Sequence, residues 1–193
     1  MMRILIAGLL GAIAMFIWTS VAHMATPLAT MGIGKMSHEA VVLNAMQEGV
    51  GGRSGLYFFP WVDPKDPKMM EKEAALTKVN PTGILVYHPP GRSTDMTKPL
   101  VHEFVKELAQ SLIAAFLLSL APLLGYFART GFVALIGVFA ALGTDASYLI
   151  WYGFPLDYTL ANAAIGIVGA AVAGLVIAAI VKPKLELRIP LGG

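Results

Sequence analysis

The feature of this sequence that could do chemistry is an acidic residue inside a long apolar stretch. Asp145 interrupts residues 130–152, and Asn162 lies about as far after the turn near Gly153 as Asp145 lies before it. Two antiparallel helices joined at that turn would bring both side chains to one depth. An ionisable group near the centre of a membrane helix costs about 2.5–3.5 kcal/mol and almost always faces protein. We therefore expect Asp145 to have polar partners.

Gln110 and Tyr148 complete this predicted polar layer. Gln110 lies a comparable distance along the chain from an expected inner turn at Arg129, and Tyr148 follows Asp145 by about one helical turn. Asn162, Gln110 and the Tyr148 hydroxyl are therefore the candidate partners of the carboxylate.

Two interpretations of the layer differ in function. In the first, Asp145 belongs to a proton or cation pathway, or to a contact between subunits. In the second, the layer is a hydrogen-bonded clamp between helices, worth less than about 2 kcal/mol. The inner halves of the helices supply only Ser119 and Thr130 as polar residues, so the sequence favours the clamp.

A stripe of small residues runs along the last apolar segment. Its members recur every four residues and are Gly166, Ala170, Gly174 and Ala178. Such a face lets another helix backbone approach closely. It serves either packing within one bundle, which the sequence favours, or docking of a partner subunit.

The histidines and methionines raise the question of a copper or haem site. All four histidines and seven of the ten methionines lie between residues 23 and 102. No two histidines have the three- or four-residue spacing that places two ligands on one helix face. His88 and His102 are weak candidates for a metal or haem, and no cofactor is predicted.

No catalytic or nucleic-acid-binding motif is present. The glycine-rich segment 49–55 lacks the Gly-Lys-Ser/Thr ending of a phosphate-binding loop. Basic residues are interleaved with acidic ones, unlike a nucleic-acid-binding surface. The absence of cysteine excludes disulfides and thiol catalysis. An enzyme is therefore not expected.

The composition indicates that these residues lie in a membrane protein. The chain is 56% hydrophobic and only 13% charged, which is too apolar for a water-soluble domain of this size. A helix crosses the bilayer core with about 20 apolar residues. We predict a bundle of four transmembrane helices at residues 1–24, 100–128, 130–152 and 158–181.

Two of these helices carry further expectations. The first is interpreted as a retained anchor rather than a signal peptide cleaved after Ala22, because its glycines and alanines suit close helix packing. The second is expected to be continuous from about residue 100 to 127, with a kink at Pro122. Its first turns, which include Glu107, would stand above the hydrocarbon.

Residues 25–99 predict a small α/β domain between the first two membrane helices. A short helix at 38–48 is followed by a strand at 56–59, a helix that begins at Pro67, and a strand at 83–87. This order fits a βαβ-like unit with two parallel neighbouring strands. A domain this small is expected to lean on the membrane helices or on a partner.

The flanking charges predict one membrane orientation. Arg3, Arg129, Lys182 and Lys184 lie on the cytoplasmic side if both termini are cytoplasmic, with a cytoplasmic tail at 182–193. Residues 25–99 are then extracytoplasmic, and a bacterial inner membrane is the expected location. The favoured function is a non-catalytic accessory or assembly subunit of a membrane complex, with the lipid bilayer and other subunits or a second copy as partners. The alternatives are a small transporter that uses Asp145 and an extracytoplasmic metal or haem binder.

Overall fold

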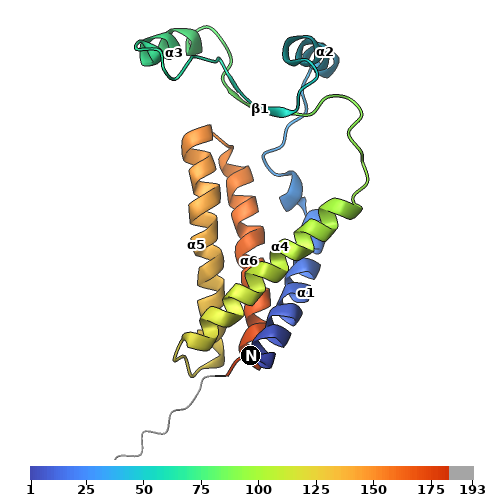
Figure 1. The fold of residues 1–193 in the computed structure, drawn as a ribbon, viewed down its shortest axis with the longest axis vertical. Helices are drawn as coiled ribbons and strands as arrows, with labels where there is room; N and C mark the ends of the chain where they lie inside the picture. The colour runs from blue at the N-terminus through green and yellow to red at the C-terminus, as the bar shows by residue number, and fades with distance from the viewer. Residues whose placement is uncertain (183–193) are drawn as a thin grey trace, which may run out of the picture. The chain divides into compact units, whose positions relative to one another are not determined.

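The computed structural model describes residues 1–182. Its elements are α1 (Met2–Ala25), the 3₁₀ turn η1 (Pro27–Thr30), α2 (Glu39–Val50), β1 (Gly55–Phe59), α3 (Met69–Thr77), β2 (Gly83–Tyr87), α4 (Thr97–Leu120), α5 (Tyr126–Tyr152) and α6 (Leu156–Ile180) (Figure 1). They form two compact units. The helical unit holds residues 1–32, 96–149 and the described residues from 154 onward, and the second unit holds 33–95 with 150–153. Except for Lys182, the predicted cytoplasmic tail lies outside the described residues.

Three helices of the helical unit are long and apolar enough to span a membrane. These are α1, α5 and α6, so long apolar helices lie at three of the four predicted positions, which supports a membrane protein. The predicted fourth span is not among them. In α4 the segment without charged residues, 108–120, covers only about 20 Å at about 1.5 Å per residue, against a hydrocarbon core of about 30 Å.

The reason lies in where α4 ends. The prediction of one helix to residue 127 with a kink at Pro122 is wrong, because α4 stops at Leu120. Ala121 is extended (φ −85°, ψ 130°), as expected for a residue whose α conformation would clash with a following proline ring. Residues 121–125 form a connecting segment and α5 begins at Tyr126. Arg129 therefore lies inside a helix and not in a tight turn.

Pairwise contacts set the directions of the helices. α1 and α4 are antiparallel, since Phe16 stacks edge-on against Phe104 at 5.6 Å between ring centroids, and Gly8 lies against Leu112. α1 and α6 are also antiparallel, since the Trp18 indole N–H donates to the Ile165 carbonyl oxygen (2.9 Å) near one end. At the other end Gly11 lies against Ile177.

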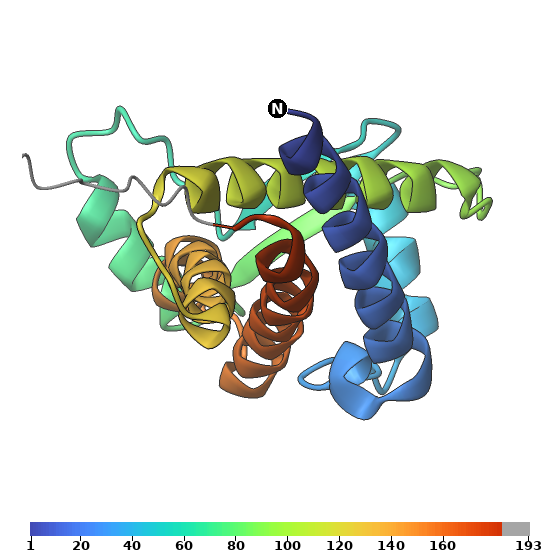
Figure 2. The same ribbon diagram turned by 90° about the horizontal axis from the view of Figure 1, so that it is seen from below.

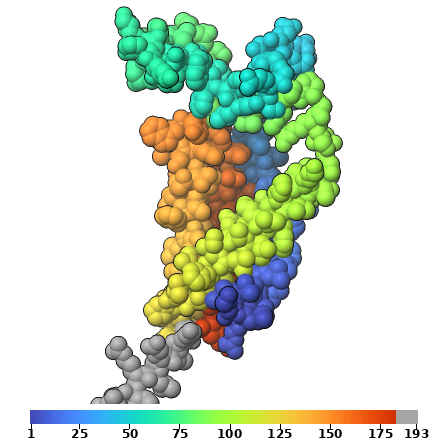
Figure 3. Space-filling view, viewed as in Figure 1, coloured from blue at the N-terminus to red at the C-terminus, as the bar shows by residue number. Residues whose placement is uncertain are grey.

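α5 packs on α6 in the same antiparallel way. Near the start of α5, Val133 contacts Gly174, and one turn later Gly137 contacts Ala170. Seen from the end, α6 lies between α1 and α5 while α4 crosses them (Figure 2). The space-filling view shows α4 and α5 covering most of α6 on one face (Figure 3). The buried core consists of small and aliphatic side chains, including Leu118, Val133 and Ile177.

The second unit has a two-stranded antiparallel sheet. Gly55 pairs with Tyr87 and Phe59 with Gly83, so the predicted parallel pairing is wrong. A parallel crossover requires its helix to pack on the sheet, whereas α3 buries none of its residues. α3 also begins at Met69 rather than at the predicted Pro67.

Candidate functional site

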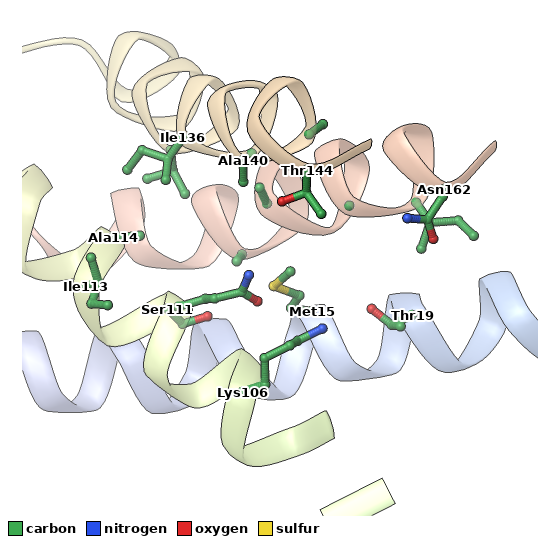
Figure 4. Close-up of a pocket in the computed structure, with 18 of the residues that line it drawn as sticks. Met15, Thr19, Lys106, Ser111, Ile113, Ala114, Ile136, Ala140, Thr144 and Asn162 are labelled. Carbon is green, nitrogen blue, oxygen red and sulfur yellow. The ribbon is translucent and has the colours of Figure 1, made fainter. Parts of the chain in front are cut away.

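A cavity of about 640 Å³ lies between α1, α4, α5 and α6. Thr19, Thr144 and Asn162 lie toward one end, and Ile113, Ala114 and Ile136 lie toward the other, with Ser111 beside them (Figure 4). Each helix contributes to the wall because the small side chains of α5 and α6 leave space that α1 and α4 do not fill. Several polar residues of the helical unit line this cavity.

The structure brings three members of the predicted polar layer into this wall. The Asn162 side-chain amide donates to Asp145 Oδ1 at 2.6 Å, and Gln110 lines the same cavity. The depth match across the turn therefore produces direct contact between Asp145 and Asn162. Tyr148 stacks against Phe154, with 5.2 Å between ring centroids.

Two charged side chains at the polar end form an ion pair. The Lys106 ammonium donates to Glu103 Oε1 at 2.6 Å, one turn away on α4. His23 also lines the cavity, with its Nδ1 2.8 Å from the Thr19 carbonyl oxygen. The polar end thus holds one ion pair, one amide–carboxylate pair and several hydroxyl and amide groups.

Glu107 is the residue that the sequence reasoning misplaced. It was expected to stand above the hydrocarbon, but it is fully buried (0% exposed), and neither carboxylate oxygen has a hydrogen-bond partner among residues 1–182. The Thr19 hydroxyl of α1 lies beside the carboxylate without forming a hydrogen bond of normal geometry. Helical spacing in the sequence could have predicted this burial. The buried face of α4 consists of Glu107, Ser111, Ala114, Ala115 and Leu118.

Ser111 lies one turn after Glu107 and reaches the cavity. It is 2% exposed, and its hydroxyl has no hydrogen-bond partner among the described residues. A buried polar group without a partner is costly, and it is uncommon in folded proteins. Ser111 is therefore a donor and an acceptor directed at an otherwise apolar space.

Comparison with protein-family models, curated proteins and solved structures finds no match to this chain. The site must therefore be interpreted from its own geometry.

Arg129 is a second buried charge that the sequence did not place correctly. Its guanidinium donates through Nε (3.2 Å) and Nη2 (3.1 Å) to the Ala178 carbonyl oxygen, and through Nη1 to the Leu124 carbonyl oxygen (2.6 Å). Ala178 lies in the last turn of α6, where carbonyl groups lack helical partners and a cation is favourable. Arg129 is a structural residue at the opposite end of the helical unit from Asp145.

The small-residue stripe of α6 packs within the same helical unit. Gly174 contacts α5 at Val133, Ala170 contacts it at Gly137, and Ala178 is fully buried. Gly166 lines the cavity. This arrangement corresponds to the bundle-packing interpretation of the stripe.

The weak metal candidates lie in separate units. His88 follows β2 in the second unit, whereas His102 lies on α4 in the helical unit. Within residues 1–182, no group of three histidine, aspartate or glutamate side chains is placed to hold a metal ion.

The distribution of polar residues along the cavity does not form an ion path across the helical unit. Most of the polar side chains lie toward the end of the cavity near Asp145, and toward the other end Ser111 lies among Val133, Ala173 and other apolar residues. A continuous ion path needs polar groups through the depth of the membrane. At the apolar end of this cavity, the described wall provides Ser111 alone as a polar group.

Proposed function

We propose that this protein is a non-catalytic accessory or assembly subunit of a larger membrane complex, and that it engages its partner through the second unit. The observation that carries the proposal is the apolar, exposed face of the β1–β2 sheet. Residues opposite one another share a face, so the pairs Leu56–Val86 and Phe58–Ile84 form one apolar surface. Leu56 is 57% exposed and Val86 68% exposed.

This unit has too little core to be stable by its own packing. Tyr87 is the single buried residue between 33 and 95, and neither α2 nor α3 buries a side chain. An isolated two-stranded sheet is at best marginally stable in water, and a large exposed apolar patch is typical of an interaction surface. A protein partner that covers this face supplies the missing core.

The proposal includes a membrane topology with both termini cytoplasmic and the second unit extracytoplasmic, in a bacterial inner membrane. α1 and α5 both run antiparallel to α6, so they begin at the same end of the helical unit, and α4 returns the chain to that end alongside α1. This direction supports α4 as a fourth crossing. Arg3, Arg129 and Lys182 then share the cytoplasmic side, as the positive-inside rule requires.

Gentle extraction of the full chain followed by native mass spectrometry tests the partner. We expect a stoichiometric protein partner with the parent chain and its loss with Val86→Asp, which places a charge on the sheet face. Val79→Asp is the matched control, because Val79 is 80% exposed and lies outside the sheet. A monodisperse parent chain without any protein partner, or equal retention of the partner by both variants, overturns the proposal.

A further inference from the structure

We infer that the cavity between α1, α4, α5 and α6 binds an amphiphile with a primary ammonium head, which pairs with the Asp145 carboxylate. The inference concerns a ligand site inside the helical unit and is independent of the proposed role of the second unit. The cavity volume, about 640 Å³, lies within the range of about 300–1,000 Å³ that is typical of small-molecule sites.

Asp145 is an acidic residue of the cavity wall without a cationic partner in residues 1–182. The Asn162 amide donates to its Oδ1 at 2.6 Å, but an amide carries no charge and leaves the charge of the carboxylate uncompensated. No lysine, arginine or histidine nitrogen of the described chain lies within 4.0 Å of this carboxylate. Because ionised groups within membrane helices pair with one another, Asp145 supplies one half of an ion pair.

The other charged side chains of the wall do not supply the missing half. The Lys106 ammonium is bound to Glu103 Oε1 at 2.6 Å on the same helix, so these two charges sum to zero. His23 has its Nδ1 2.8 Å from the Thr19 carbonyl oxygen of its own helix. With His23 neutral, the wall has a net charge of −1, from Asp145 and Glu103 against Lys106. Such a wall attracts a cationic head and repels a carboxylate or phosphate head.

The uncharged groups at the same end suit a head that carries N–H donors. Thr19, Thr144 and Asn162 lie there (Figure 4), and their hydroxyl and carbonyl oxygens can accept hydrogen bonds. A primary ammonium group has three donors, so it can bind the Asp145 carboxylate and such oxygens together. A quaternary ammonium group has no donor, and an alcohol has no charge. The site therefore distinguishes a primary ammonium head from both.

The opposite end of the cavity is apolar and suits a hydrocarbon chain. Ile113 and Ile136 lie there, with Ser111 beside them (Figure 4). From Asp145 to Val133, both of which line the cavity, α5 rises about 18 Å at about 1.5 Å per residue. A chain can therefore extend along the wall from a head held at Asp145. Since lipid tails are as apolar as this wall, the head supplies most of the selectivity.

The direction of the cavity matches an amphiphile that already lies in one leaflet. α5 is long and apolar enough to span a membrane, and Asp145 lies about 10 Å before its end at Tyr152 at about 1.5 Å per residue. Val133 is farther from that end and closer to the middle of the helix. Thr144 and Asn162 are exposed, so the polar end is open to the surroundings of the helical unit. A head near the bilayer surface and a chain toward its centre thus enter without turning over.

Photolabelling of the full chain in nanodiscs tests the inference. The membrane is phosphatidylcholine, which has no primary ammonium group, and the probe is dodecylamine with a diazirine in its chain. We expect saturable labelling around the cavity that unlabelled dodecylamine displaces. At equal concentration in the membrane, dodecanol and dodecyltrimethylammonium should each compete at least about tenfold less well, a factor that corresponds to about 1.4 kcal/mol. Equal competition by dodecanol and dodecylamine overturns the inference without any variant.

Asp145→Asn isolates the charge, because an asparagine oxygen still accepts a hydrogen bond from Asn162. This variant should lose the preference for dodecylamine over dodecanol. Asp157→Asn is the matched control, since Asp157 is an exposed acidic residue in the first turn of α6 that does not line the cavity. It should keep the preference of the parent chain. A preference for the amine that survives Asp145→Asn contradicts the pairing.

Two further variants distinguish the cavity from the general lipid surface. Ala140→Phe fills the cavity and should abolish the saturable labelling. Leu142→Phe lies on an outer face of the same helix, where Leu142 is 64% exposed, and should leave the labelling intact. Labelling that is spread over all helices and unchanged by both variants would show that no such site exists.

Nanodiscs that also contain phosphatidylethanolamine identify the source of the head. Displacement of the probe by this lipid assigns the site to a lipid head group with a primary ammonium. Retention of the probe assigns it to a free long-chain amine. Both results require the same pairing with Asp145, so both should disappear in Asp145→Asn.

Discussion

At the scale of single residues, Arg129 joins the beginning of α5 to the end of α6. Its bonds to Ala178 and Leu124 are charge-assisted and largely buried. We predict that Arg129→Leu lowers the free energy of unfolding by about 1.5–3 kcal/mol, the range for hydrogen bonds to charged groups. Arg129→Lys should recover only part of the loss, because an ammonium does not reproduce the planar fork. Unfolding in mixed micelles measures both.

Arg3 provides the control for that prediction. It carries the same charge near the beginning of α1, and it is exposed. Arg3→Leu should leave the unfolding free energy within experimental error. An equal loss in the two variants would mean that net charge, rather than the contacts of Arg129, sets the effect.

Asp145 and Asn162 form the second residue-scale pair. As a clamp, the pair predicts that Asp145→Ala and Asn162→Ala each destabilise the protein by less than about 2 kcal/mol and that a double-mutant cycle shows positive coupling. Asp145→Asn should leave proton or cation flux into liposomes unchanged from the parent chain. Loss of a pH-dependent flux in Asp145→Asn, with folding intact, would favour the ion-pathway interpretation instead.

At the scale of elements, the close approach of α5 and α6 depends on glycine. A Cβ atom at Gly137 would lie 2.6 Å from Ala170 Cβ, whereas nothing lies within 4 Å of one at Gly143 on the same helix. We predict that Gly137→Ala lowers stability by about 1–3 kcal/mol through overpacking. Gly143→Ala should be neutral or stabilising by up to about 1 kcal/mol through helix propensity. The same sign of change in both variants would contradict this packing.

The start of α3 gives a pH-dependent element. The Lys72 ammonium and then the Lys68 backbone N–H hold the pKa of Asp66 below its usual range. A pKa that is lower in the folded state than in the unfolded state stabilises the folded state at pH values above the unfolded-state pKa. This stabilisation is lost as the pH falls through the folded-state pKa. The protection factors of the α3 amides, which compare observed with intrinsic exchange rates at each pH, should therefore fall at acidic pH, and Lys72→Met should raise the pKa of Asp66 measured by NMR titration. If Lys72→Met leaves the titration of Asp66 unchanged, the contact with Lys72 does not lower the pKa of Asp66.

Sequence patterns predicted some elements better than others for physical reasons. Long apolar runs define α1, α5 and α6 because lipid imposes length and composition together. The end of α4 could not be predicted in the same way, because a helix can either kink or end near a proline such as Pro122. The strand orientation depended on whether α3 packs on the sheet, which its few apolar residues do not achieve.

The candidate site divides in the same way. The contact between Asp145 and Asn162 could be predicted from the sequence, because the two residues lie equally far from one turn. Glu107 was misplaced because a charged residue near a helix end was assigned to water, although its spacing with Ser111 and Leu118 matches the buried face. The cavity itself depends on how α4 crosses its neighbours, which no single segment encodes.

At the scale of the whole molecule, the directions of the helices predict four crossings and a single orientation. The chain contains no cysteine, so single cysteines report topology without a background. Ser54 in the second unit and Asp157 at the start of α6 should react from one side of the membrane. Leu124, between α4 and α5, and Lys182 should react from the other side, which the positive-inside rule identifies as cytoplasmic.

The position of Leu124 decides whether α4 crosses. If α4 only lies along the membrane surface, Leu124→Cys will react with a membrane-impermeant maleimide from the same side as Ser54→Cys. If α4 crosses, the two will react from opposite sides, and Asp157→Cys will follow Ser54→Cys. Because α4 runs antiparallel to α1 along contacts from Phe104 to Leu112, we expect the second pattern. The crossing would then be completed by the connecting segment 121–125 beyond the short apolar run of the helix.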